Sequence, residues 1–143
     1  VINAPYLEKK VITNDVVEIF SRNSFRWKGR YDNVINSGGI KISPEILEQA
    51  IGKIFTRLGL TNRFFLHYTP DDKLGQRLVV VMESPLPEAT VLHAISEAFK
   101  QTFSPHERVR GLYESSHLVM TDTQKVNRRE SFKTSRQVAG FFY

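Results

Sequence analysis

Apolar residues recur at helical spacing in two stretches of this chain. Between residues 46 and 58 they stand three or four positions apart, which places them on one face of a helix. Ser43 and Pro44 suit the start of that helix, because a serine can cap the first turn and a proline fits the first helical position. Gly59 suits its end. A second stretch, residues 91–99, predicts another helix of the same amphipathic kind.

Short runs of β-forming residues surround the two helices. Residues 11–30 carry branched and aromatic side chains on both sides of the segment 21–24, whose Asn and Ser residues predict a hairpin turn. Residues 63–68 and 76–83 predict two strands joined by a turn, and residues 109–120 predict one or two more.

The order of these elements predicts an α+β fold. We expect a small lid domain: a short N-terminal β-hairpin, then a three-stranded sheet packed with about three helices. The third helix is a weak, basic one within residues 125–138. With 143 residues, 41% of them hydrophobic and 24% charged, the chain can form one globular core.

The composition excludes several classes of site and leaves others open. The sequence has no Cys, which excludes a disulfide scaffold, a thiol nucleophile and a thiolate metal site. The four His residues lack the spacing of metal ligands, so we expect no metal site. No apolar run is long enough to cross a bilayer and no signal peptide is visible, so we expect no membrane association and a cytoplasmic location. The net charge of +5 is compatible with an anionic partner such as a nucleotide, a coenzyme or nucleic acid.

Two segments carry a more specific pattern. Residues 29–48 read GRYDNVINSGGIKISPEILE and residues 121–128 read TDTQKVNR. The first resembles the hinge signature of the adenylate-forming enzymes: Gly-Arg-x-Asp-Asp, a hydrophobic pair, Gly-x-basic-hydrophobic, then Pro-x-Glu-hydrophobic-Glu. The second resembles the Thr-x-Ser/Thr-Gly-Lys-x-x-Arg element of the same superfamily, which includes acyl-CoA synthetases and peptide-synthetase adenylation domains. Residues 13–15 (TND) also resemble its Thr-Gly-Asp triplet, and the whole resemblance covers about residues 10–136.

This resemblance implies a domain organisation and a reaction. Residues 1–30 would be the tail end of the preceding N-terminal domain, and residues 31–143 the C-terminal lid domain of an ATP-dependent, AMP-forming acid–CoA ligase. Such an enzyme activates a small carboxylic acid as an acyl-adenylate and then forms a thioester with CoA. The segment 37–39 is most similar to the o-succinylbenzoate–CoA ligases of menaquinone biosynthesis. Mg²⁺ is expected for the full-length enzyme but not bound by this domain, and we expect the isolated chain to be inactive.

The resemblance also assigns roles to single residues. Lys125 would be the catalytic lysine, because an ammonium group can offset the charge that develops when a carboxylate attacks the α-phosphate. Asp32 would be the hinge residue about which the lid rotates. Arg30 and Asp15 would bind the nucleotide. Gln124 stands where the family has Gly; a glycine allows a positive φ there, which would cost Gln energy, so either the geometry or the reactivity of this loop can differ from the family's.

The remaining assigned residues concern CoA. Gly38 and Gly39 would border the channel for the pantetheine arm, since a residue without Cβ lets a ligand lie against the backbone. Lys41 would meet phosphates of CoA or the nucleotide.

Each of these residues also has a purely structural interpretation, as a hairpin glycine, a turn aspartate or a solvated lysine. Two other functions stay open: a lid that loads the pantetheine of a carrier protein, and a basic nucleic-acid-binding module.

Overall fold

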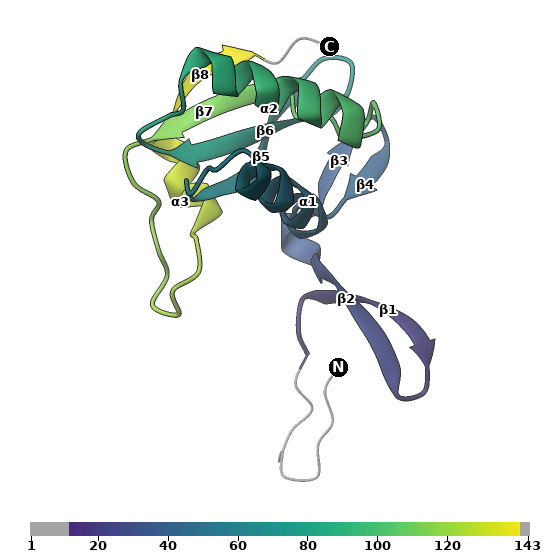
Figure 1. The fold of residues 1–143 in the computed structure, drawn as a ribbon. Coiled ribbons are helices and arrows are strands. Elements are labelled where there is room, and N and C mark those ends of the chain that lie inside the picture. Colours follow the sequence, from purple (N-terminus) through teal and green to yellow (C-terminus); the bar gives the residue numbers. More distant parts are fainter. Residues whose placement is uncertain (1–11, 141–143) are drawn as a thin grey trace.

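The structure is a computed structural model that describes residues 12–140 (Figure 1). The first eleven residues of the predicted tail lie outside the described part. The elements in chain order are β1 (Asp15–Ser21), β2 (Ser24–Arg30), the 3-10 turn η1 (Tyr31–Asn33), β3 (Ile35–Ser37), β4 (Ile40–Ile42), α1 (Pro44–Arg57), β5 (Phe64–Asp71), β6 (Gly75–Glu83), α2 (Ala89–Thr102), β7 (Gly111–Ser115), α3 (Arg128–Lys133) and β8 (Arg136–Gly140).

The strands form two separate sheets. Strands β1 and β2 form an antiparallel hairpin, which projects away from the rest of the molecule in Figure 1. The other six strands form one sheet in the order β4-β3-β6-β7-β8, with β5 paired to the opposite edge of β6. Only β6 and β7 run parallel, and α2 makes the crossover between them. Strand β6 is therefore the centre of the sheet.

Side chains from both faces of the sheet are buried, which gives the domain three layers. On one face, α1 and α2 pack over alternate strand residues such as Leu66, Val80 and Leu112. On the other face, Phe65 and Val81 belong to a second cluster. Its further members are Tyr113 from β7, Leu118, Met120 and Val126 from the loop before α3, and Phe132 from α3. A strand buried on both faces needs consecutive apolar residues, which explains the run of apolar residues along β6.

The predicted α+β fold, with an N-terminal hairpin and three helices, is confirmed. The predicted three-stranded sheet is wrong in its number of strands, because the sheet has six. Strands β3 and β4 have three residues each, too few to give a clear alternation of apolar residues. Strand β8 was missed because its sequence, RQVAG, reads as part of the basic segment.

The helix boundaries follow the local signals closely. Helix α1 begins at Pro44 after Ser43, and the chain leaves it through Gly59, whose φ of 73° is one that glycine adopts without strain. The segment 84–87 (SPLP) predicts the start of the second helix, but α2 begins later, at Ala89. Among the residues that the structure describes, no helix combines the length and the apolar character that a bilayer-spanning segment needs.

The core makes a quantitative prediction. The side chain of Phe99 on α2 is fully buried and its ring stacks at 6.4 Å from that of Phe55 on α1. Phe99→Ala should lower the free energy of unfolding by about 3–5 kcal/mol, because it removes buried apolar surface and leaves a cavity. Lys100→Ala, one exposed position further on, should change it by less than about 0.5 kcal/mol. Urea denaturation of the two variants checks this, and equal effects would contradict the described core.

Candidate functional site

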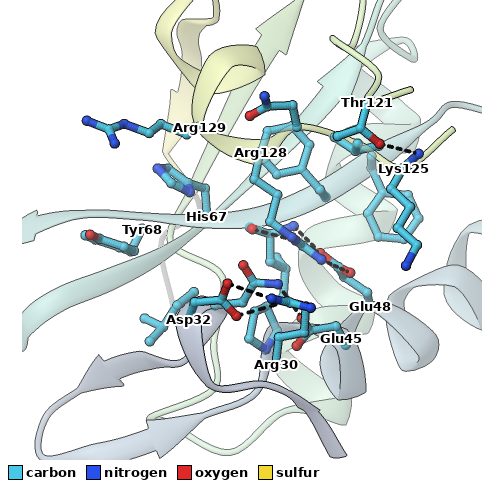
Figure 2. Close-up of a pocket in the computed structure, with 18 of the residues that line it drawn as sticks. Arg30, Asp32, Glu45, Glu48, His67, Tyr68, Thr121, Lys125, Arg128 and Arg129 are labelled. Carbon is cyan, nitrogen blue, oxygen red and sulfur yellow. Dashed lines mark hydrogen bonds and ion pairs between the residues drawn. The ribbon is translucent and has the colours of Figure 1, made fainter. Parts of the chain in front are cut away.

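A cleft of about 1140 Å³ lies where residues 30–33, α1, β5 and the loop before α3 meet. Figure 2 shows the side chains that point into it. The cleft brings Lys125 together with Arg30 and Asp32, two predicted site residues that lie far from it in the sequence. Its other polar lining residues are Asn33, Glu45, Glu48, His67, Tyr68, Thr121, Thr123, Asn127, Arg128 and Arg129.

The loop that carries Lys125 is a tight turn closed by its own backbone. The amide of Thr121 donates to the carbonyl oxygen of Lys125 at 2.7 Å, and the amide of Lys125 donates to Thr121 Oγ1 at 3.1 Å. A bridge between Met120 and Val126 continues this pairing toward the body of the domain. The side chain of Lys125 is exposed and extends from this turn into the cleft (Figure 2).

Gln124 occupies the left-handed region of the backbone within this turn. Its φ is 60°, and it is the only non-glycine residue with a positive φ among residues 12–140. This conformation costs an L-amino acid roughly 1–2 kcal/mol, whereas glycine adopts it freely. The turn thus keeps a shape that suits glycine although Gln124 stands there.

The segment around Asp32, the predicted hinge residue, is held by an ion pair between neighbours in the sequence. The guanidinium of Arg30 donates to both carboxylate oxygens of Asp32, at 3.0 and 2.9 Å. These hydrogen bonds lower the pKa of the Asp32 carboxyl and raise that of Arg30. Asp32 lies in the 3-10 turn that links the hairpin to β3, so it stands at the junction of the two sheets.

Helix α1 contacts this junction through Glu45. Its Oε1 accepts a hydrogen bond of 2.6 Å from the side-chain amide of Asn33. Its Oε2 is buried, with no hydrogen-bond partner within the described residues, and lies against the backbone of Gly29. A Cβ at Gly29 would come within 2.5 Å of that oxygen, and the φ of Gly29 is 138°, a conformation that residues with a side chain rarely adopt.

One turn further along α1, Glu48 pairs with Arg128 at the start of α3. The Arg128 guanidinium contacts both carboxylate oxygens, Nη1 with Oε1 and Nη2 with Oε2, the latter at 2.8 Å. Burial alone would lower the pKa of Arg128, but the hydrogen bonds and charge of Glu48, together with the charge of Glu45, raise it above its ordinary value. Arg128 thus stays charged in a largely buried position.

Asp15 lies near the cleft without lining it. Its carboxylate accepts a hydrogen bond of 3.1 Å from the indole nitrogen of Trp27, which is the main cause that lowers its pKa. The positive charges of Arg30 and Lys125 lower it further. The β1–β2 hairpin and the turn that carries Lys125 (residues 121–125, the lysine loop) are therefore close enough for their charges to interact.

The three residues assigned to CoA lie elsewhere. Gly38 and Gly39 form the turn between β3 and β4, with φ values of 59° and 82°, and Lys41 is exposed on β4. None of them lines the cleft. In Figure 1 the β3–β4 hairpin stands on the other side of the domain from the loop that carries Lys125. Two positive φ values in a two-residue turn are what a hairpin of this kind requires, so the turn itself explains both glycines.

Several residues of the cleft were missed by the sequence interpretation. Glu45, Glu48 and Arg128 all stand at fixed positions of the two matched motifs, so the signal was present but was read only as family likeness. His67 was dismissed for lack of ligand spacing. It is half-buried against Phe132 and Tyr68, and burial, with the charge of Arg128, lowers its pKa. No group of three or more His, Asp or Glu residues suited to hold a metal occurs within residues 12–140.

Solved structures provide the comparison that decides the fold. An acyl-CoA synthetase (AMP-forming)/AMP-acid ligase II-like protein from Dyadobacter fermentans is 41% identical, over 86% of this chain and 35% of that chain, with a TM-score of 0.67. The o-succinylbenzoate CoA synthetase of Bacillus subtilis, in complex with its acyl-adenylate intermediate, is 16% identical, over 89% and 25% of the two chains, with a TM-score of 0.72. The fold is that of the C-terminal domain of AMP-forming acid–CoA ligases.

Other neighbours agree with this fold. ATP-bound MatB from Rhodopseudomonas palustris is 15% identical over 83% of this chain and 23% of that chain, with a TM-score of 0.64. This chain therefore spans about a third of the Dyadobacter protein and about a quarter of the other two. A scan of protein-family models and a search of curated proteins found no match.

The strained turn gives a direct prediction. Gln124→Gly should raise the free energy of unfolding by about 0.5–1 kcal/mol, because relief of the left-handed strain outweighs the greater freedom of glycine in the unfolded chain. Asp122→Gly in the same turn, where φ is not positive, should be neutral or destabilising. Denaturant unfolding of the two variants measures the difference, and destabilisation by Gln124→Gly would show that Gln124 holds the turn in another way.

Proposed function

We propose that this chain is the C-terminal lid domain of a longer, cytoplasmic, AMP-forming acid–CoA ligase. The observation that carries the proposal is the position of Lys125. Its side chain stands on a turn closed by backbone hydrogen bonds and enters a cleft that also holds Arg30 and Asp32. An ammonium group placed on such a turn can meet the charge that builds up as a carboxylate oxygen attacks the α-phosphorus of ATP and pyrophosphate leaves. Mg²⁺ would neutralise the phosphates from the part of the protein that precedes this chain.

The exposed hairpin supports the proposed domain organisation, with residues 1–30 as the end of the preceding domain. One face of the hairpin is apolar and open to solvent. It is formed by Val17, Ile19, Phe25 and Trp27, which are 41%, 73%, 67% and 43% exposed. A two-stranded sheet is barely stable by itself in water, so this face needs a partner. We propose that the preceding domain of the same protein covers it.

The separation of Lys125 from the glycine turn supports two reaction steps on two surfaces. Lys125 would serve adenylation, and the segment with Gly39 and Lys41 would serve thioester formation after rotation about Asp32. A Cβ built on Gly39 meets nothing within 4 Å, so there is open space beside that backbone for a pantetheine arm. The first acid to test is o-succinylbenzoate, because residues 37–39 resemble the ligases for that acid. CoA is proposed as the acceptor over a carrier protein, since the neighbours include CoA ligases.

The catalytic assignment is tested in the full-length protein. Lys125→Ala should lower acid-dependent pyrophosphate exchange by roughly 10²–10³-fold, because the ammonium acts mainly in the transition state. Thioester formation from a supplied acyl-adenylate should be spared. Lys133→Ala is the matched control, since that lysine is exposed on α3 and pairs with Glu130. If pyrophosphate exchange in the Lys125 variant stayed within a few-fold of wild type, Lys125 would be a surface lysine without a catalytic role.

The hinge assignment is tested by restricting the backbone. Asp32 lies in a 3-10 turn, whose φ is close to the value that proline imposes. Asp32→Pro should therefore keep the orientation seen here and retain adenylation, while thioester formation fails because the lid cannot rotate. Asp32→Asn removes the charge opposite Arg30 without restricting φ, and should retain both steps. Loss of thioester formation in both variants would assign the effect to the ion pair with Arg30 and not to rotation.

A further inference from the structure

The Glu48–Arg128 pair has the features of a positioning device. The two side chains are only 19% and 20% exposed, and their contact is bidentate, which fixes direction as well as distance. They come from α1 and α3, which are far apart in the sequence. Arg128 follows Lys125 by three residues, so it stands at the base of the lysine loop.

The pair is also tied to the edge of the large sheet. Strand β5 bonds only to β6, which leaves outward-facing backbone groups on its other edge. The amide of Leu66 donates to Glu48 Oε1 at 2.6 Å, and its carbonyl accepts from Arg128 at 3.0 Å. Glu48 and Arg128 thus take the place of a neighbouring strand at this point. Their position is set by the backbone of the sheet and not only by each other.

The lysine loop meets the sheet differently on its two sides. Before the turn, the amide of Leu118 donates to Glu83 Oε1 on β6 at 3.0 Å. The turn itself is closed within residues 121–125, and apolar contacts of Met120 and Val126 with Phe65 and Val81 hold its base. Apolar contacts bury surface but do not fix an angle. After Lys125, the directional contact with the sheet is made by Arg128, so the direction of the loop on this side depends on that residue.

We propose that Glu48 and Arg128 are positioning residues for Lys125 and set the place of its ammonium group in adenylation. The inference rests on the proposed function. Glu45, one turn earlier on α1, holds Asn33, the neighbour of the proposed hinge residue Asp32, so the same helix fixes the loop of Lys125 relative to the hinge.

The test uses the full-length protein and both half-reactions. Glu48→Gln and Arg128→Lys should each lower acid-dependent pyrophosphate exchange by about 10²-fold, because a displacement of about 1 Å is enough for such a loss. Thioester formation from a supplied acyl-adenylate should stay within a few-fold of wild type. Glu130→Gln, which removes the exposed pair with Lys133 on α3, should leave both steps unchanged.

A double-mutant comparison separates positioning from a general structural role. In a Lys125→Ala background, Glu48→Gln should lower the remaining exchange by less than about 2-fold, because residues that act through one group are not additive. Arg128→Lys, which keeps the charge, provides the same comparison if Glu48→Gln folds poorly. An equal loss in both backgrounds, or an equal loss of both half-reactions, would overturn the inference. Absence of acid-dependent exchange in the wild-type protein would instead overturn the proposed function.

Discussion

The arrangement of the cleft depends on two carboxylates that lie one turn apart on α1. Residues three positions apart share a face of a helix, so Glu45 and Glu48 point to the same side. Glu45 accepts a hydrogen bond from Asn33 in the hinge segment, and Glu48 holds Arg128 below the lysine loop. Because α1 is itself packed on the large core, one helix holds both the segment beside Asp32 and the base of the loop that carries Lys125.

This arrangement also decides which charges are available to a ligand. Arg30 and Arg128 line the cleft but are paired with Asp32 and Glu48. Within residues 12–140, Lys125 forms no ion pair, and neither does Arg129, another exposed cation of the cleft. An anion that enters the cleft therefore meets cations that are not already neutralised. The net charge of +5 alone could not have shown which of the 20 basic residues these are.

Local signals predicted the parts of the fold that short-range chemistry determines. Ser43, Pro44 and Gly59 marked both ends of α1, although the Ser43 side chain makes no capping hydrogen bond within the described residues, and the Asn–Ser segment marked the turn of the first hairpin. Strand β8 could not be predicted, because it is stabilised by its pairing with β7 and not by a pattern within its own five residues. The sequence around Gly38 and Gly39 indicates two short extended pieces, which are β3 and β4, but not their pairing with β6.

In the candidate site too, the sequence predicted single residues but not the contacts between distant segments. The motifs named Lys125, Arg30 and Asp32, and the cleft contains all three. They could not show that Glu48 and Arg128 pair across 80 residues of sequence. That pairing is a property of the packed sheet, whose edge supplies the backbone partners of both side chains. Periodicity and spacing describe only neighbours along the chain.

The central claim is that this domain serves a reaction through an acyl-adenylate, and oxygen transfer tests it most directly. A carboxylate oxygen that attacks the α-phosphorus of ATP stays on AMP when a thiol later takes the acyl group. The full-length protein should therefore transfer oxygen-18 from a labelled carboxylic acid to AMP, with none in pyrophosphate, as measured by mass spectrometry. Unlabelled AMP, or release of ADP with the label in inorganic phosphate, would contradict the account.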